Sequence, residues 1–124
     1  MCKILISINP EHVEKIIAKI NRYEYRTKVA KRDIDSIIIY CTYPTKKVLA
    51  EVKIKSILED TPERLWARTK EYSGITKAFF DRYFAGRVKA YAYELGEVIK
   101  YNRPKELSEF GCLVAPQSYV YINA

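Results

Sequence analysis

The stretch Arg22-Tyr23-Glu24-Tyr25-Arg26 carries the strongest local prediction in this chain. Successive side chains of a strand point to opposite faces, so Tyr23 and Tyr25 share one face while Glu24 and Arg26 share the other. An acid and a base then lie one strand repeat apart, about 6.5–7 Å. We expect the tyrosines to pack inward and the charged pair to face a cleft.

A strand and a helix are expected directly before this stretch. Lys3–Ile8 contains an apolar run of strand length. Asn9-Pro10 then supplies an N-cap residue and a proline suited to the first helical turn. The following helix of about three turns is expected to bury one apolar stripe. That stripe is formed by Val13, Ile16, Ile17 and Ile20.

Further strand and helix signals follow along the rest of the chain. Strands are predicted at 36–42 and from 48 to a bulge near Lys55-Ser56, followed by a long strand over 87–101 bent at Gly96 and a closing strand over 119–122. Helices are expected to begin after Thr61 and Thr76, each a good N-cap. The second of these helices carries aromatic residues at helical spacing, which predicts a core face. They are Phe79, Phe80, Tyr83 and Phe84.

These elements predict a single α+β domain over residues 1–124. Short connections favour antiparallel pairing, and helices that interrupt the strands without alternating with them argue against a doubly wound sheet. Bulges and glycine bends favour a small open β-barrel of about five to seven mostly antiparallel strands, with about three helices.

The positive charge is concentrated in two segments. The chain has a formal net charge of +7, and residues 19–32 alone carry +5 while residues 46–55 carry +3. This distribution favours an anionic partner, of which nucleic acid is the commonest. A solvated basic surface without a partner is the alternative.

The chain offers few metal ligands. Cys2, Cys41 and Cys112 form no CxxC pair, and His12 is the single histidine, expected to be solvated. A zinc site needs about four well-placed ligands, so we expect no metal and no cofactor. Unpaired cysteines suit a reducing compartment, and the apolar run after Lys3 is too short for a signal or membrane segment. These features predict a soluble, cytoplasmic protein.

The first strand, the capped helix and Tyr23-Glu24-Tyr25-Arg26 together resemble the ASCH domain of the PUA-like superfamily. The family pattern is roughly Gly-x-Lys-x-x-Glu-x-Arg. Glu24 and Arg26 match it, whereas Lys19 stands at the glycine position and Asn21 at the lysine position. Further segments resemble a small bacterial and archaeal ASCH-like subgroup. They are Ile38–Tyr40 leading into Pro44, Thr61-Pro62-Glu63, Tyr72-Ser73-Gly74-Ile75 and Ala115-Pro116-Gln117-Ser118-Tyr119.

The resemblance implies a PUA-like barrel with a cleft beside the first helix, and a function linked to RNA or nucleotides. Some ASCH proteins are hydrolases of N4-acetylcytidine, and ribonuclease activity is attributed to others. The motif lysine belongs to the catalytic set of the amidohydrolases, but an amide such as Asn21 cannot act as a general base or nucleophile. The sequence therefore favours a binding module for RNA or a modified nucleobase, with a regulatory role in RNA metabolism or transcription, over an enzyme.

In that interpretation Arg26 contacts a phosphate or a base edge, and Glu24 accepts from an exocyclic amine or orients Arg26. Lysines contact the phosphate backbone of the nucleic acid, Tyr40 or Tyr43 stacks on an unpaired base, and Gln117 reads a base edge. The predicted ligand-contacting set is Glu24, Arg26, Lys28, Tyr40, Thr42, Lys46, Lys47 and Gln117.

Three alternatives remain open at this point. A hydrolase of nucleosides or RNA would use Glu24 as acid/base and Arg26 as oxyanion stabiliser, with Cys41 as a conceivable nucleophile. A protein-interaction domain would present the basic face to an acidic partner. Finally, Glu24 and Arg26 would form a merely structural salt bridge, worth about 0–1 kcal/mol if exposed.

Overall fold

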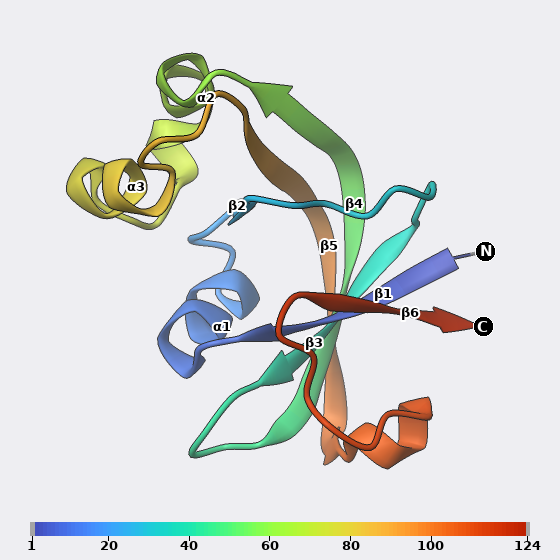
Figure 1. The fold of residues 1–124 in the computed structure, drawn as a ribbon. Coiled ribbons are helices and arrows are strands. Elements are labelled where there is room, and N and C mark those ends of the chain that lie inside the picture. Colours follow the sequence, from blue (N-terminus) through green and yellow to red (C-terminus); the bar gives the residue numbers. More distant parts are fainter. Residues whose placement is uncertain (1, 124) are drawn as a thin grey trace.

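The computed structural model describes residues 2–123 as one six-stranded sheet with three α-helices (Figure 1). The strands are β1 (Cys2–Ile8), β2 (Tyr23–Arg26), β3 (Ser36–Cys41), β4 (Lys47–Asp60), β5 (Ala90–Lys105) and β6 (Tyr119–Asn123). Their order across the sheet is β2-β5-β4-β3-β1-β6. The helices are α1 (Pro10–Ile17), α2 (Pro62–Thr69) and α3 (Lys77–Tyr83), with short 3₁₀ turns η1 (Lys70–Tyr72) and η2 (Leu107–Phe110).

The sheet is mixed and stays open. β1 and β3 pair in parallel, with α1 and β2 lying in the connection between them, and the other four pairings are antiparallel. The predicted α+β class is therefore confirmed. The sheet is open, as predicted, and it does not close into a barrel: within residues 2–123 the edge strands β2 and β6 do not pair with each other.

The long strands β4 and β5 bend sharply and carry α2 and α3 at one end (Figure 1). Their register shifts between Val52 and Ile54 and again between Ile54 and Ser56, which confirms the bulge expected near Lys55-Ser56. An extra residue on one strand increases local twist and bends the ladder. The bend, with Gly96 on the opposing strand, turns the β2 side of the sheet towards α1, and this arrangement forms the site described below.

α1 is shorter than its apolar pattern predicted. Val13 and Ile16 are 1% exposed, but Ile20 is 57% exposed because the helix ends at Ile17. The expected cap also differs: the Asn9 side chain makes no capping hydrogen bond, and its Oδ1 accepts from Thr42 Oγ1 at 3.2 Å. Thr61 and Thr76 do cap their helices through Oγ1, as predicted.

The aromatic face of α3 is only partly core. Phe80 and Phe84 are buried and pack with Leu65 and Tyr25, which joins α2, α3 and β2 into one apolar cluster. Phe79 and Tyr83 are 42% and 38% exposed. The prediction that all four aromatics form the core is thus wrong for the two residues on the flank of the helix.

Candidate functional site

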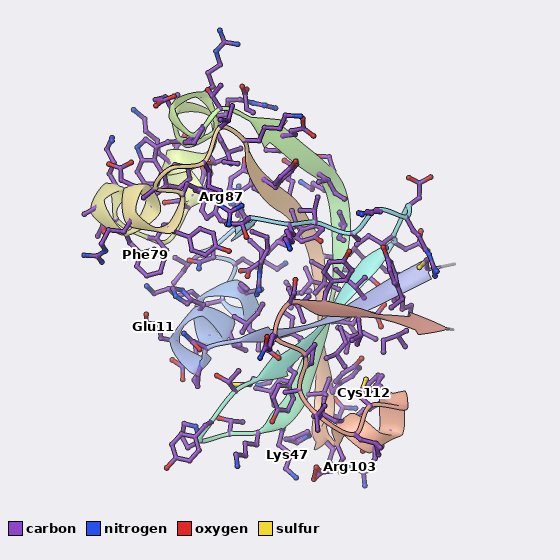
Figure 2. The ribbon with its side chains drawn as sticks, viewed as in Figure 1. Glu11, Lys47, Phe79, Arg87, Arg103 and Cys112 are labelled. Carbon is purple, nitrogen blue, oxygen red and sulfur yellow. The ribbon has the colours of Figure 1, made fainter. Side chains whose placement is uncertain are left out.

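A cavity of about 230 Å³ lies between α1, β2 and α3, at the end of β1. We refer to it as the Glu24–Arg26 cavity. One part of its wall is polar and the other is aromatic and apolar, and Figure 2 shows Phe79 on the side of α3 that faces α1. The lining residues are Ser7, Ile8, Asn9, His12, Asn21, Tyr23, Glu24, Tyr25, Arg26, Ser73, Ile75, Phe79 and Tyr83.

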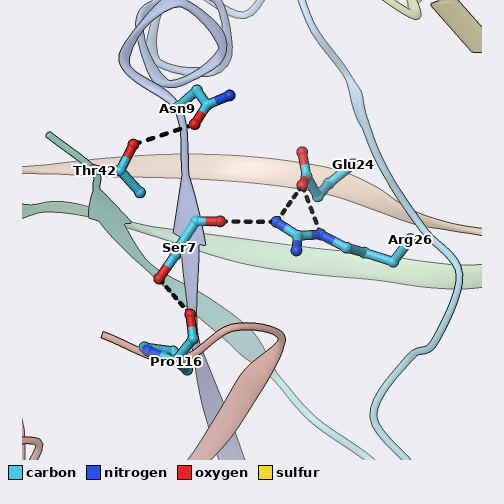
Figure 3. A network of polar contacts seen from close by, with 6 residues as sticks. All are labelled: Ser7, Asn9, Glu24, Arg26, Thr42 and Pro116. Carbon is cyan, nitrogen blue, oxygen red and sulfur yellow. Dashed lines mark hydrogen bonds and ion pairs between the residues drawn. The ribbon is translucent and has the colours of Figure 1, made fainter. Parts of the chain in front are cut away.

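Glu24 and Arg26 form a close ion pair in the cavity wall (Figure 3). Arg26 donates to Glu24 Oε2 from Nε at 2.9 Å and lies 2.8 Å from the same oxygen through Nη2. Their side chains are only 18% and 14% exposed. The shared face of the acid and the base is therefore confirmed, and the pair is shielded from solvent much more than a surface salt bridge.

Tyr25 points to the other face of β2, as strand alternation predicted. It is 9% exposed, and its hydroxyl donates to Thr69 Oγ1 at 2.6 Å. Thr69 Oγ1 in turn donates to the carbonyl of Leu65 at 2.8 Å, so the two hydroxyls form a short chain that ends on α2. Burial raises the pKa of Tyr25 to about 12. This contact anchors β2 to α2 directly behind the charged pair.

Hydrogen bonds link the ion pair to the end of β1 and, through Ser7, to the loop before β6 (Figure 3). Arg26 Nη2 donates to the carbonyl of Ser7 at 3.0 Å, and Ser7 Oγ donates to the carbonyl of Pro116 at 2.8 Å. On the same side, Thr42 holds the Asn9 side chain. The end of β1 therefore positions the guanidinium from one side, while Glu24 positions it from the other.

Part of the ion pair's hydrogen-bonding capacity is unused within residues 2–123. Arg26 bonds through Nε and Nη2, and Glu24 through Oε2. Nη1 of the guanidinium and Oε1 of the carboxylate remain as a donor and an acceptor. Figure 3 shows these two atoms on opposite sides of the ion pair, so each offers a separate hydrogen bond to a ligand in a recess with aromatic walls.

Asn21 is a buried polar residue at the inner wall of the cavity. It is 5% exposed, and its Oδ1 is buried without a hydrogen-bond partner among residues 2–123. Gly74 lies directly against it: a Cβ at Gly74 would fall 1.5 Å from that oxygen. The position at which the ASCH motif has lysine is thus occupied by a short amide packed against the backbone of the η1–α3 connection.

Lys19, which stands at the glycine position of the ASCH motif, has an unusual backbone conformation. Lys19 has a φ of +62°, a left-handed conformation that glycine adopts without steric cost. This explains why the family pattern has glycine at this place. The lysine keeps the same turn after α1 at some cost in backbone energy.

Replacing Lys19 with glycine should therefore stabilise the fold. The left-handed conformation costs a non-glycine residue about 1–2 kcal/mol, and the greater flexibility of unfolded glycine offsets about 0.5–1 kcal/mol of that gain. We expect Lys19→Gly to raise the free energy of unfolding by about 0.5–1 kcal/mol in urea titrations. Lys19→Ala retains the strain, so an equal gain in that variant would contradict this explanation.

The remaining predicted site residues do not gather in this cavity. Lys28 is exposed after the end of β2, and Gln117 is exposed next to Pro116 without lining the cavity. Thr42 reaches the cavity wall only through Asn9. Tyr40 is 7% exposed and packs in the core under η2, so it offers little surface on which a base could stack.

Lys46 and Lys47 line a different recess, together with Tyr40, Glu106 and neighbouring residues. Lys47 is ion-paired with Glu106. Figure 2 shows Lys47 at the end of the molecule opposite α2 and α3. Lys46 and Lys47, the first part of the second basic segment, therefore lie away from the Glu24–Arg26 cavity.

Sequence reasoning missed three aromatic residues of the cavity. His12, predicted to be solvated, has a side chain that is 19% exposed and a ring 6.1 Å from that of Phe79. Tyr83 follows Phe79 by one helical turn. Phe79 and Tyr83 form one i, i+4 stripe on the helix, and Phe80 and Phe84 form a second stripe beside it. Together the two stripes are wider than one core contact can bury. The width of this aromatic face was the signal in the sequence that could have pointed to the cavity.

Residues 2–123 offer neither a metal site nor a membrane-spanning helix. In residues 2–123 no three His, Cys, Asp or Glu side chains converge in a way that could hold a metal ion. The helices described there are all too short or too polar to cross a bilayer. Cys2, Cys41 and Cys112 have free thiols, and Cys41 is buried in β3.

Comparison with curated proteins gives partial-length likenesses, and no family model matches the chain. It is 29% identical over 122 residues to the large ribosomal subunit protein uL22 of Ureaplasma parvum, covering 97% of this chain and 39% of that protein. It is 24% identical to ATP synthase subunit alpha of the same species, covering 97% of this chain and 15% of that protein. The chain thus spans well under half the length of these relatives, whose names describe components of two unrelated complexes.

Solved structures give full-length likenesses. The ASCH protein of Zymomonas mobilis superposes with a TM-score of 0.88 at 25% identity, covering 98% of this chain and 87% of that one. A tyrosine-to-phenylalanine variant of that protein gives a TM-score of 0.88 at 24% identity, covering 98% and 90%. The fold predicted from the motif resemblance is confirmed: this chain has the fold of the ASCH-domain structures.

Proposed function

We propose that this protein binds an unpaired nucleobase, in RNA or as a modified nucleoside, in the Glu24–Arg26 cavity. The observation that carries the proposal is a largely buried carboxylate–guanidinium pair in the cavity wall, in which Glu24 Oε1 and Arg26 Nη1 have no hydrogen-bond partner within residues 2–123. The Watson–Crick edge of a nucleobase presents a hydrogen-bond donor next to an acceptor. Carboxylates accept from exocyclic amines, and guanidinium groups donate to ring nitrogens and carbonyls.

The size and the walls of the cavity fit the same ligand. A volume of about 230 Å³ is room for roughly eight water molecules, enough for one base and too little for a folded macromolecular segment. Phe79 and Tyr83 supply aromatic surface, on which unpaired bases stack in RNA-binding proteins. A base in a duplex would have its edge already occupied, so single-stranded ligands are favoured.

The same geometry supports binding over hydrolysis. Asn21 occupies the place of the motif lysine and cannot serve as a nucleophile or a general base. Its amide is also packed against Gly74, so it has little freedom to approach a ligand. One curated relative is named as a ribosomal protein, which is consistent with an RNA partner. Because another is named as an ATP synthase subunit, the proposal rests on the cavity and not on those names.

The binding role predicts a clear effect of the ion pair. Calorimetric titration with cytidine should show saturable binding, and Glu24→Gln and Arg26→Gln should each weaken it by about 10- to 100-fold, which corresponds to the roughly 1–3 kcal/mol of a good base contact. A cytidine methylated at N3 should bind poorly to the parent, because its edge is blocked.

A matched control is available at another ion pair. Glu59 pairs with Lys89 at 3.2 Å on the surface, and both side chains are more than half exposed. Glu59→Gln should therefore leave nucleoside affinity unchanged. Equal affinity of the parent and Glu24→Gln for cytidine, or equal affinity of the parent for cytidine and its N3-methyl form, would remove the proposed role. Release of acetate from N4-acetylcytidine by the parent would instead favour the hydrolase.

A further inference from the structure

A second recess, of about 280 Å³, lies where the connection between α1 and β2 meets the bend of β4 and β5. We refer to it as the Lys55 recess. Its floor is apolar and its rim is charged. The lining residues are Ile16, Lys19, Asn21, Arg22, Lys55, Leu95, Gly96, Glu97 and Val98.

The rim carries positive charge that nothing neutralises locally. Lys19, Arg22 and Lys55 form no ion pair within residues 2–123. By contrast, Lys3, Lys47, Lys53, Lys77 and Lys89 are all paired with carboxylates. Glu97 is the one carboxylate that lines the recess, so its net charge is positive.

The backbone holds these cations in place from two directions. Lys19 and Arg22 follow α1 in a turn set by the left-handed Lys19, and the Arg22 guanidinium stacks 3.9 Å above the ring of Tyr72. Lys55 comes from the bulged part of β4, where its stem runs across Gly96: a Cβ at Gly96 would lie 3.4 Å from Lys55 Cγ. Without a side chain at Gly96, the lysine can cross the bend of β5.

Asn21 connects this recess to the first one. It lines both the Lys55 recess and the Glu24–Arg26 cavity, so one buried residue separates the two. A ligand that places a base beside Glu24 and Arg26 therefore has a cluster of free cations on the other side of the α1–β2 connection.

We propose that the Lys55 recess is a phosphate subsite, which binds the sugar–phosphate backbone of the strand whose base occupies the Glu24–Arg26 cavity. This assignment rests on the proposed nucleobase-binding function. Lysine ammonium groups and a stacked, planar guanidinium are the usual donors to phosphate oxygens. Phosphate contacts position the strand while the cavity reads the base.

The salt dependence of RNA binding tests this subsite. Each phosphate contact on a single strand contributes about 0.7 to the slope of log Kd against log salt concentration. In fluorescence anisotropy with a labelled eight-nucleotide single-stranded RNA, Lys19→Asn and Lys55→Gln should each lower the slope by about 0.7, and the double variant by about 1.4. Both variants should bind free cytidine, which has no phosphate, as tightly as the parent.

Lys46 provides a matched control. It shares with Lys19 an exposed side chain, a positive φ of +52° and the absence of an ion pair within residues 2–123, but it lies in the turn between β3 and β4. Asparagine tolerates the left-handed conformation, so Lys19→Asn and Lys46→Asn remove one charge each without adding backbone strain. An equal loss of slope in Lys46→Asn and Lys19→Asn would show a diffuse charge effect and would overturn the subsite.

The outcomes also separate this proposal from the previous one. If the parent binds neither cytidine nor RNA but binds tripolyphosphate, and Lys19→Asn and Lys55→Gln weaken that binding, the recess stands and the nucleobase function fails. If cytidine binds and the RNA slope is unchanged in both variants, the nucleobase function stands and the recess fails. A glutamate homopolymer that binds as tightly as the RNA at equal salt would overturn the phosphate assignment.

Discussion

Gly74→Ala is expected to destabilise the protein by about 2–4 kcal/mol, far more than an ordinary glycine substitution. Two costs combine at this position. The φ of +72° disfavours any L side chain, and the added methyl group would lie 1.5 Å from Asn21 Oδ1 and 2.2 Å from its Cγ. Asn21 is 5% exposed, so relieving the overlap requires a buried side chain to move into the cavity.

The two costs can be separated with variants that the chain itself suggests. Gly86 has a similar φ of +75°, and a Cβ there would meet no atom within 4 Å. Gly86→Ala should therefore cost only the backbone component, about 1–2 kcal/mol. In an Asn21→Ala background, Gly74→Ala should fall to a similar value, because the overlapping atoms are gone. Urea unfolding of the parent, Asn21→Ala, Gly74→Ala and the double variant completes a double-mutant cycle with an expected coupling of about 1–2 kcal/mol.

Equal destabilisation by Gly74→Ala and Gly86→Ala would contradict the close packing of Asn21 on Gly74. The cycle also bears on the site. Because Asn21 lines both recesses, a shift of its side chain in Gly74→Ala should weaken nucleoside binding, whereas Gly86→Ala should not. The comparison therefore measures how strongly packing against Gly74 fixes Asn21, the residue at the lysine position of the ASCH motif.

The local part of the fold could be predicted from the sequence because its signals are short-range. Strand alternation placed Glu24 and Arg26 on one face and Tyr25 on the other, and the structure confirms both. The bulge near Lys55-Ser56 followed from a break in the phase of alternation. Each of these inferences uses residues that lie within a few positions of one another.

The composition of the site could not be predicted in the same way, because it depends on how distant elements meet. The carbonyl of Ser7 reaches Arg26 across 19 residues of sequence, and no residue pattern encodes a backbone acceptor. Phe79 and Tyr83 were assigned to the core, yet the bend of the sheet leaves their flank of α3 facing α1. Tyr40 looked available on a strand but lies under η2, an element with only one helical turn.

The positive charge shows the same limit. The sequence contains two basic segments, but which of their lysines form ion pairs with carboxylates depends on the fold. Lys47 and Lys53 lie near Glu106 and Glu51, whereas Lys19 and Lys55 have no carboxylate partner in the described chain. What matters for an anionic ligand is the unpaired charge around a recess, and the sequence gives only the total.

Alkaline pH is expected to destabilise this protein strongly through two buried tyrosines. Burial raises the pKa of Tyr25 and of Tyr93 to about 12, from about 10 in the unfolded chain. Between these values the folded state binds more protons than the unfolded state, so stability falls as pH rises. The contribution is fully present below pH 10 and is lost as pH approaches 12. Each tyrosine accounts for about 1–3 kcal/mol of that loss.

Phenylalanine substitutions isolate the effect. Tyr25→Phe loses the hydrogen bond to Thr69 and should be about 1 kcal/mol less stable than the parent at pH 8. Its free energy of unfolding should then fall less steeply from pH 9.5 to 11.5, and the curves of variant and parent should converge or cross. Tyr93→Phe should behave alike, because its hydroxyl accepts from the backbone amide of Ala30 in the main core.

Tyr43→Phe is the control, since Tyr43 is 76% exposed and its hydroxyl has no buried environment to lose. Urea titrations at fixed salt across this pH range give the free energy of unfolding as a function of pH. Lysine deprotonation affects the parent and the variants equally, so its contribution cancels in the difference between their curves. A Tyr25→Phe curve parallel to that of the parent would show that the hydroxyl is not held protonated by the cluster of α2, α3 and β2.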